Sequence, residues 1–487
     1  MPNTVRNPGL SQVSLIFACG TAAFSDGYAN NVIGSAECAV ITRTYGDAAV
    51  SQHNYSTTIS SVAFAGTVVG MIVFGYLSDR IGRKFGMMTA TCIIAVFSAL
   101  SAASSGAHHS LAGMLSMLSA CRFILGIGVG AEYPCGAVAA AEQSEQPGIR
   151  RNAQNRWFVL ATNTMIDWGF VVGAFVPLVL YWIFGADHLR AVWRVSLGLG
   201  VVPALAVLVW RLRMEEPTRY KKDSMKRCKI PYALVIKRYW KNLAPICATW
   251  FIYDFIVYPF GIYSSTVVNT VTGGSTALSI VFGWNVVINL FYIPGTIGGA
   301  FIVDYIGPKY CQILGLLCQA VIGFIMSGLY AQLTHHIAAF AVVYGIFLSF
   351  GEVGPGNCTG ILASKTSPTA IRGQFYGIAA AVGKVGAFAG TWAFPAVIKD
   401  FGSGTLSDTG PFWIGSGLAV LSAAITFLWI KPLTHDGMAE EDCLFREYLE
   451  ANGYDTSQMG LEGNEAVGEK DEELDASVEE KEVQVLT

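Results

Sequence analysis

"GYLSDRIGRK", residues 75–84, is the most specific motif in the chain and joins two long apolar segments. Its glycines allow a tight turn, and Asp79 can accept hydrogen bonds at a helix end. Arg83 and Lys84 would lie at the charged inner surface of a membrane. The motif therefore predicts a turn between two membrane-spanning helices, with a charged turn of no further role as the alternative. We expect six of its residues to gate the movement of helices: Gly75, Asp79, Arg80, Gly82, Arg83 and Lys84.

The composition is that of a membrane protein, since 53% of the 487 residues are hydrophobic and only 13% are charged. A helix that crosses a hydrocarbon core of ~30 Å needs about 20 residues. Segments of this length predict an all-α membrane protein with twelve transmembrane helices, surrounded by the lipid bilayer and without a nucleic-acid partner. The segments cover residues 12–35, 57–79, 85–104, 111–141, 157–183, 191–212, 243–267, 277–303, 310–331, 336–363, 372–398 and 410–431. The eleven cysteines show no CxxC spacing, so no metal site is expected.

Basic residues in the links between segments predict the orientation in the membrane. Arginine and lysine gather after the second, fourth and sixth segments, and such links face the cytoplasm, so both termini are expected there. The chain divides into a six-helix half (1–210), a cytoplasmic loop (211–242), a second six-helix half (243–431) and an acidic, disordered tail (432–487). Asn54 begins a glycosylation-acceptor tripeptide, for which chance occurrence is the favoured explanation.

The two halves share three features. "GYLSDRIGRK" has an echo in "AFIVDYIGPK" (300–309), and "GAEYPCG" (130–136) has one in "GEVGPGNCTG" (351–360). Asp167 and Lys384 lie at equivalent places, near the middle of the fifth and the eleventh segment. Three matches in register predict a duplicated six-helix unit, as in many transporters. A structural salt bridge between Asp167 and Lys384 is one explanation of these two charges.

Trp250, Asp254 and Tyr258 lie four residues apart in the apolar stretch "WFIYDFIVYPFG" (250–261), so they share one helix face. An ionisable group at the bilayer centre is costly and is tolerated mainly where it lines a cavity or has a partner. The face therefore suits a polar ligand, with an Asp254 bound to a neighbouring helix as the alternative. Other charges at membrane depth belong to Asp26, Arg122, Glu132, Asp167, Glu352 and Lys384. Lys384 is the expected anion-binding group, and the surplus carboxylates are the expected proton carriers.

These motifs resemble those of a known family. "GYLSDRIGRK" resembles the loop signature of the major facilitator superfamily, and "RFILGIGVGAEYP" (122–134) resembles its fourth-helix pattern. The Trp-x3-Asp-x3-Tyr face, the acid-Tyr-Pro of 132–134, Asp26 and the Gly-Lys of 383–384 look like the phosphate:proton symporter branch. On that pattern a phosphate group would be surrounded by Tyr133, Trp250, Asp254, Tyr258 and Lys384. The proton relay would consist of Asp26, Glu132, Arg122 and Asp254.

Longer stretches, such as "FIYDFIVYPFGIYSS" (251–265), are similar to the fungal glycerophosphodiester permeases, whose best-known substrate is glycerophosphoinositol. The chain departs from the phosphate carriers at Glu132, where they usually have Asp, and at Asp167, where an amide is expected. A phosphodiester carries a single negative charge, so it fits a site with extra carboxylates better than phosphate does. Asn285 and Asn289, four residues apart, would hydrogen-bond a polyol or, alternatively, hold two helices together.

The sequence thus predicts a proton-coupled symporter that imports glycerophosphodiesters such as glycerophosphoinositol by alternating access. It is expected to be a monomer of the plasma membrane and not an enzyme, with protons as the coupling ion and no cofactor. An inorganic phosphate:proton symporter is the alternative within the class. A nutrient sensor that binds its ligand without moving it is the alternative from another class, and the short acidic tail speaks against it.

Overall fold

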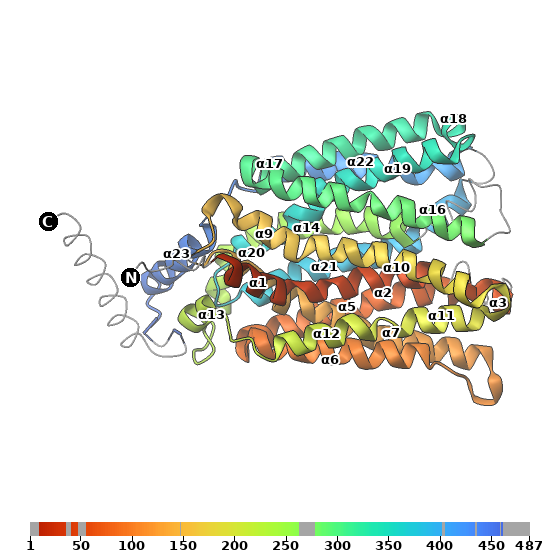
Figure 1. Cartoon of the computed structure of the whole chain (residues 1–487). Helices are drawn as coiled ribbons and strands as arrows, with labels where there is room; N and C mark the ends of the chain where they lie inside the picture. The colour runs from red at the N-terminus through yellow and green to blue at the C-terminus, as the bar shows by residue number, and fades with distance from the viewer. Residues whose placement is uncertain are drawn as a thin grey trace, which may run out of the picture.

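The computed structural model describes residues 9–35, 40–46, 55–146, 148–262, 278–401, 405–433, 436–457 and 459–460. Long helices run side by side, and the short helices α13 (Thr218–Asp223) and α23 (Gly437–Ala451) lie beyond one end of them (Figure 1). We call this the α13/α23 end of the bundle. Asn54 and residues 461–487, which hold most of the acidic run, lie outside the described residues.

The long helices fall into two groups that follow the two halves of the sequence. Helices α6, α7 and α12 of the first half lie on the opposite side of the bundle from α17, α19 and α22 of the second (Figure 1). The first half contains α1 (Gly9–Gly20), α2 (Phe24–Ser35), α3 (Thr42–Tyr45), α5 (Tyr55–Arg80), α6 (Arg83–Ala102), α7 (Leu111–Glu132), α8 (Val138–Ser144), α9 (Gln154–Ala161), α10 (Asn163–Phe184), α11 (Leu189–Gly198) and α12 (Val201–Arg211). The second contains α14 (Tyr232–Ile262), α16 (Leu278–Leu290), α17 (Tyr292–Gly328), α18 (Tyr330–Thr334), α19 (Ile337–Gly351), α20 (Asn357–Lys365), α21 (Arg372–Asp400) and α22 (Thr405–Trp429). Helix α5 packs against α7 within its own half and against α21 across the halves.

The predicted twelve-span fold is confirmed. Ten helical stretches in the described part of the chain are long and apolar enough to cross a membrane. The stretch Leu278–Gly328 covers two predicted spans, because the chain leaves the helical conformation at Gly307 between them. The predicted span 12–35 corresponds to α1 and α2, which are separated by a short 3-10 turn.

Equivalent glycines form the turns of the repeated motif. Gly82 has a φ of 143° and Gly307 a φ of 78°, conformations that favour glycine because it has no Cβ. Each glycine follows an aspartate by three residues, Asp79 in the first half and Asp304 in the second. The echo between the two sequence motifs is therefore matched by an echo in backbone conformation.

The second pair of repeated motifs also adopts one local structure. Glu132 directly precedes the π-helical turn Tyr133–Ala137, and Glu352 begins the π-helical turn Glu352–Gly356. A π-turn inserts an extra residue into a helix and often occurs at functional sites. The structure thus places two equivalent glutamates next to two equivalent irregularities.

Two predicted domain boundaries differ from the structure. Arg211, expected to begin the central loop, lies in the last turn of α12 and is fully buried. Helix α14 begins at Tyr232, so the last part of the expected loop (211–242) is helical.

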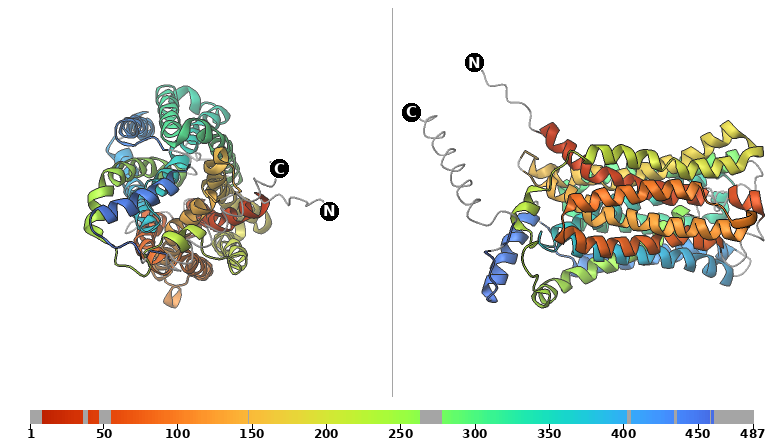
Figure 2. Two further views of the ribbon diagram at one scale, coloured as in Figure 1. Left: turned by 90° about the vertical axis from the view of Figure 1, so that its left-hand side faces the viewer. Right: turned by 90° about the horizontal axis from the view of Figure 1, so that it is seen from below.

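The expected disordered tail (432–487) also contains an ordered element, helix α23. Met438, Phe445 and Leu449 are buried, since their spacing places them on one face of the helix. The acidic residues between them make the average composition of the segment polar, so the composition alone did not predict this apolar face. Helix α23 runs across the long helices rather than along them (Figure 2).

The predicted gating motif joins the two halves near the α13/α23 end. Asp79 accepts hydrogen bonds from the backbone N–H of Gly373 (2.9 Å) and of Gln374 (2.8 Å), at the start of α21. A Cβ at Gly75 would lie 3.0 Å from the carbonyl oxygen of Gly373, so glycine permits this close approach. Helix α5 is thereby fixed to the N-terminal end of α21.

Four buried charges extend this junction. Arg83 pairs with Asp79 (2.5 Å) and with Glu142 on α8 (3.1 Å), and Glu142 also pairs with Arg372 on α21 (3.1 Å). None of the four side chains is exposed. We call Asp79, Arg83, Glu142 and Arg372 the junction network. Because buried charges need partners, the halves cannot separate here without an electrostatic cost.

The other charged residues of the motif bind the central loop. Arg80 donates to the carbonyl oxygen of Cys228 (2.9 Å), and the backbone N–H of Lys84 donates to Glu216 (3.1 Å). Glu216 also accepts from the backbone N–H of Arg83 (3.0 Å). The Glu216 carboxylate thus satisfies free amides in the first turn of α6.

Candidate functional site

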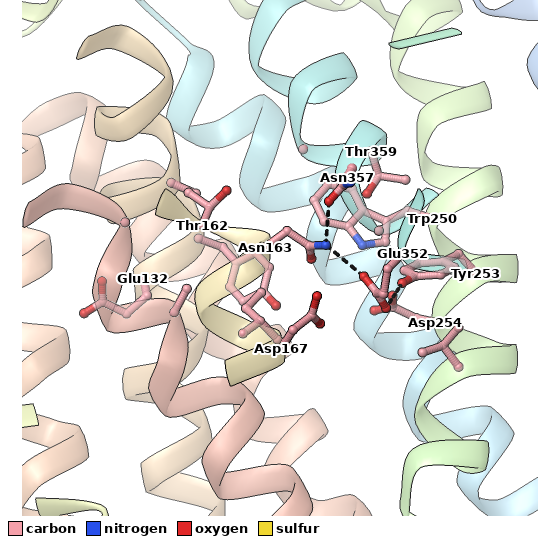
Figure 3. A pocket seen from close by; sticks show the side chains of 18 of the residues that line it. Glu132, Thr162, Asn163, Asp167, Trp250, Tyr253, Asp254, Glu352, Asn357 and Thr359 are labelled. Atoms are coloured by element: carbon pink, nitrogen blue, oxygen red, sulfur yellow. Dashed lines mark hydrogen bonds between the residues drawn. The ribbon is translucent and has the colours of Figure 1, made fainter. Parts of the chain in front are cut away.

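A cavity lies between the two halves, bordered by α10 of the first half and by α14, α20 and α21 of the second. Its empty space is about 760 Å³ when the open mouth is included. Figure 3 shows side chains that line it. The charged lining residues are Glu132, Asp167, Asp254, Glu352 and Lys384.

The face of α14 predicted from the spacing points into this cavity. Trp250, Asp254 and Tyr258 all line it, with exposed fractions of 5%, 1% and 6%. A Cβ at Gly383 on α21 would lie 2.5 Å from the Trp250 ring, so this glycine makes room for the indole beside Lys384. The predicted acid between two aromatic side chains is therefore present at the cavity wall, and its role in binding a ligand stays a prediction.

Lys384 on α21 contacts carboxylates of both halves. Its Nζ lies 3.5 Å from Oδ2 of Asp254 and 3.6 Å from Oδ2 of Asp26 on α2. It also donates a hydrogen bond to the hydroxyl of Tyr258. The alternative pairing of Lys384 with Asp167 is wrong, because Asp26 and Asp254 take this place.

Asp26 completes this group of residues. Its Oδ2 accepts hydrogen bonds from the hydroxyls of Tyr133 (2.5 Å) and Tyr258 (3.2 Å), and its Oδ1 accepts one from Asn30 (2.6 Å). The ring of Tyr133 lies 6.4 Å from that of Trp250. The structure therefore brings together the five residues predicted to bind phosphate and two of the four predicted for the proton relay, Asp26 and Asp254. We call Asp26, Tyr133, Trp250, Asp254, Tyr258 and Lys384 the lysine cluster.

A second polar group lies in the same cavity, and most of its members were not predicted. Tyr253 donates to Oε1 of Glu352 (2.7 Å), and Asn163 on α10 donates to Oε2 (2.8 Å). Asn163 also donates to Oδ1 of Asn357 on α20 (2.9 Å), as Figure 3 shows. One signal was available in the sequence, since Asn163 precedes Asp167 by four residues and so shares its helix face.

Asp167 lies one helical turn after Asn163 and lines the cavity from the same helix. Its exposed fraction is 1%, and its Oδ2 has no hydrogen-bond partner among the described residues. The carboxylate points towards that of Glu352 (Figure 3). A buried oxygen without a donor is costly, so this atom is a candidate contact for a ligand.

Glu132, a predicted proton carrier, is bound by a cation that the sequence analysis assigned to a loop. Arg211 Nη1 and Nη2 donate to its Oε1 (2.7 Å) and Oε2 (2.8 Å). The Glu132 carboxylate points away from Asp167 and Glu352 in Figure 3. Arg211 was overlooked because it follows a long apolar segment and begins a basic run, which placed it outside the membrane. Proton transfer by Glu132 stays a prediction.

Three further predicted residues are not part of the cavity lining. Arg122 on α7 donates to the carbonyl oxygens of Ile59 (3.0 Å) and Ala29 (3.2 Å). Asn289 on α16 accepts a hydrogen bond from Asn31 of α2 (3.0 Å) and donates to the carbonyl oxygen of Asn285 (2.7 Å). This geometry matches the helix-to-helix alternative for the two asparagines. Their contact with a substrate, like the relay role of Arg122, stays a prediction.

Two six-helix halves with a charged cavity between them define the fold of a multi-pass membrane carrier. The profile of the family described as the Major Facilitator Superfamily matches residues 19–391. The chain belongs to this superfamily.

Known proteins agree with this assignment. A glycerophosphocholine permease of Candida albicans is 46% identical over 470 residues, which cover 96% of this chain and 87% of the relative. A major glycerophosphoinositol permease of the same organism is 45% identical, covering 92% and 84%. A glycerophosphoinositol transporter of Saccharomyces cerevisiae is 33% identical, covering 94% and 86%. Among solved structures, the proton:xylose symporter XylE of E. coli superposes with a TM-score of 0.73 at 20% identity, covering 90% of this chain and 99% of that one, which supports the fold.

Proposed function

We propose that the chain is a proton-coupled symporter that imports glycerophosphodiesters by alternating access. The observation that carries this proposal is the position of Lys384, a buried cation between two carboxylates at the wall of a cavity shared by both halves. Permeases of glycerophosphocholine and glycerophosphoinositol at 45–46% identity support the substrate class. The substrate would bind with its phosphate at Lys384, Tyr133 and Tyr258.

Competition for Lys384 supplies a physical basis for coupling. A phosphodiester that contacts the ammonium has to replace Asp26 or Asp254, which lie 3.6 and 3.5 Å from it. Protonation removes the negative charge of such a carboxylate, so it weakens its attraction for Lys384 and its repulsion of the phosphate. Proton and anion therefore favour each other's binding. One proton with one monoanion crosses without net charge, and each further proton adds about 2.3 kcal/mol per 100 mV of membrane potential.

Alternating access requires the junction network to open and close. Arg83 and Arg372 bind Glu142 in common, so the α13/α23 end is closed in this conformation. We place this end in the cytoplasm, because the basic links lie at this end, and the protein as a monomer in the plasma membrane. Substrate release into the cell would then need the three-way contact of Arg83, Glu142 and Arg372 to separate.

Uptake by cells lacking their own phosphate and glycerophosphodiester carriers tests the proposal. Labelled glycerophosphocholine and glycerophosphoinositol should accumulate at acidic external pH, and a protonophore should abolish accumulation. Lys384→Ala should lower binding of both by roughly 30- to 1,000-fold, since it removes a charge-assisted contact inside the protein. Lys399→Ala is the matched control, because Lys399 lies on the same helix, is exposed and does not line the cavity.

Two outcomes would contradict the proposal. Entry of free phosphate without either diester would make the protein an inorganic phosphate symporter, a function that the name of a 30% identical Toxoplasma gondii protein brings into consideration. Binding without uptake by the correctly localised protein would favour the sensor.

A further inference from the structure

The carboxylates around the cavity outnumber the cations that compensate them. Arg211 binds Glu132, and Lys384 is shared by Asp254 and Asp26. Asp167 and Glu352 form no ion pair within 4.0 Å in the described part of the chain. Both are at least nine-tenths buried, with exposed fractions of 1% and 4%. Buried carboxylates without a cation are costly, so the side of the cavity lined by Asp167 and Glu352 favours an incoming positive charge.

The hydrogen bonds of Glu352 show what a ligand would have to supply at this carboxylate. Its two oxygens already accept from Tyr253 (2.7 Å) and Asn163 (2.8 Å). A neutral polyol would therefore offer donors that Glu352 does not lack, whereas a cation would offer the absent charge. Oδ2 of Asp167 lacks both a donor and a counter-charge among the described residues.

Helix α14 connects this side of the cavity to the lysine cluster. Its consecutive residues Tyr253 and Asp254 contact Glu352 and Lys384, respectively. A ligand with an anion and a cation separated by a few bonds can therefore reach both sides at once. Aromatic rings line the same cavity, including those of Trp250, Tyr253 and Phe170, and aromatic faces attract alkylammonium groups.

We propose that Asp167 and Glu352 form a subsite for the ammonium group of a zwitterionic glycerophosphodiester. The inference rests on the proposed function, since the phosphodiester at Lys384 places the ammonium on this side. Head groups are then selected by charge: a quaternary or primary ammonium binds here more tightly than an uncharged polyol such as inositol. Tyr253 and Asn163 act as positioning residues, because they hold the Glu352 carboxylate by hydrogen bonds.

A pair of ligands of one shape tests the subsite. Glycerophosphocholine is compared with its 3,3-dimethylbutyl isostere, in which a carbon replaces the nitrogen and removes the charge. The full chain is reconstituted in lipid vesicles, and both compounds compete with labelled glycerophosphoinositol in exchange, which involves no net proton movement. Glycerophosphocholine, which carries the ammonium, should bind at least roughly tenfold more tightly than the isostere.

Variants then assign the effect to residues. Asp167→Asn and Glu352→Gln keep side-chain shape, and each should bring the affinity ratio of the two ligands towards one. Asp304→Asn is the matched control, because Asp304 is also buried but is bonded to the backbone of Arg156 outside the cavity lining. It should leave the ratio unchanged.

The outcomes separate this inference from the proposed function. Equal affinity of the wild-type protein for the two ligands overturns the subsite, and this comparison needs no variant that folds. A ratio unchanged in both carboxylate variants overturns it as well. Absence of exchange with every glycerophosphodiester overturns the proposed function instead.

Discussion

Lys384, which lines the cavity, joins the two halves by its ion pair with Asp26, with 3.6 Å between Nζ on α21 and Oδ2 on α2. The same Asp26 oxygen accepts hydrogen bonds from Tyr133 of the first half and Tyr258 of the second. A single carboxylate therefore contacts groups that must separate when the halves move. Its protonation would alter contacts on both sides of the boundary.

Asp26→Asn should keep exchange of labelled substrate but lose uphill uptake. The amide still fills the space and accepts hydrogen bonds from the two tyrosines, but it cannot deliver a proton. Exchange and proton-driven accumulation are measured in the same vesicles. Equal loss of both, with normal expression, would assign Asp26 to substrate binding or to the fold.

Asp254→Asn should bind substrate with a much weaker dependence on external pH. In the parent protein the ionised carboxylate repels the phosphodiester, so uptake should be faster at acidic pH and fall towards neutrality. The amide is never charged, which removes this repulsion at every pH, while proton-driven accumulation should fail. Binding measured from pH 5 to 8 checks the result, and a pH profile identical to the parent's would exclude coupling through Asp254.

Glu132→Gln should destabilise the protein more than Asp254→Asn does. The substitution leaves the fully buried Arg211 without its ion-pair partner, a change that typically costs about 3–5 kcal/mol. Thermal unfolding in detergent compares the two variants. Replacing both partners, as in Glu132→Leu with Arg211→Met, should recover much of the loss. If Glu132→Gln unfolds like the parent but loses accumulation, Glu132 acts as a proton carrier and not as a structural partner of Arg211.

Arg372→Ala should open the α13/α23 end. Arg372 pairs with Glu142 and lies 3.6 Å from Asp442 of α23, so its removal takes away the ion pair through which α21 holds α8 and weakens the contact between the halves there. Spin labels at the exposed Arg150 and Lys431 should report longer and broader distances than in the parent. Arg190→Ala serves as the control, because Arg190 is exposed and is not part of the junction network. An unchanged distance distribution would show that the junction network does not hold the closed state.

The stability of the Glu216→Gln variant, measured relative to the parent, should increase from acidic to neutral pH. Burial raises the pKa of Glu216 above its ordinary 4.5, so the folded protein binds a proton more readily there than the unfolded chain. The contribution of this group to stability is present below the unfolded pKa and is lost as pH rises through the folded one. Gln cannot titrate. The unfolding temperature of the variant minus that of the parent should therefore increase as the pH is raised from 4.5 to 8. A difference that stays constant over this range would contradict the prediction.

Local patterns carried much of the prediction. The turn at 75–84 followed from its glycines and charges, and the shared face of Trp250, Asp254 and Tyr258 followed from their spacing, because both depend on neighbours along one helix. Equivalent turns at Gly82 and Gly307 were also visible as a sequence repeat.

Contacts between distant segments were the part that the sequence could not supply. Asp167 and Lys384 occupy equivalent positions, but which acid meets Lys384 depends on how α2 packs against α21. The role of Arg211 depended on how α12, which ends at this residue, packs beside Glu132 of α7. Asn163 and Tyr253 are ordinary polar residues until the fold brings them to Glu352.

The paired π-turns occur in the motifs that repeat between the two halves. Glu132 and Glu352 stand at matching points of the two halves. Glu132 pairs with Arg211, whereas Glu352 accepts hydrogen bonds from the uncharged Tyr253 and Asn163 and has no ion pair in the described part of the chain. The two equivalent positions thus differ in the charges that surround them. One arginine at the end of α12 therefore makes the two matching positions electrostatically unequal, and Arg211→Met would leave Glu132 as uncompensated as Glu352 is in the described part of the chain.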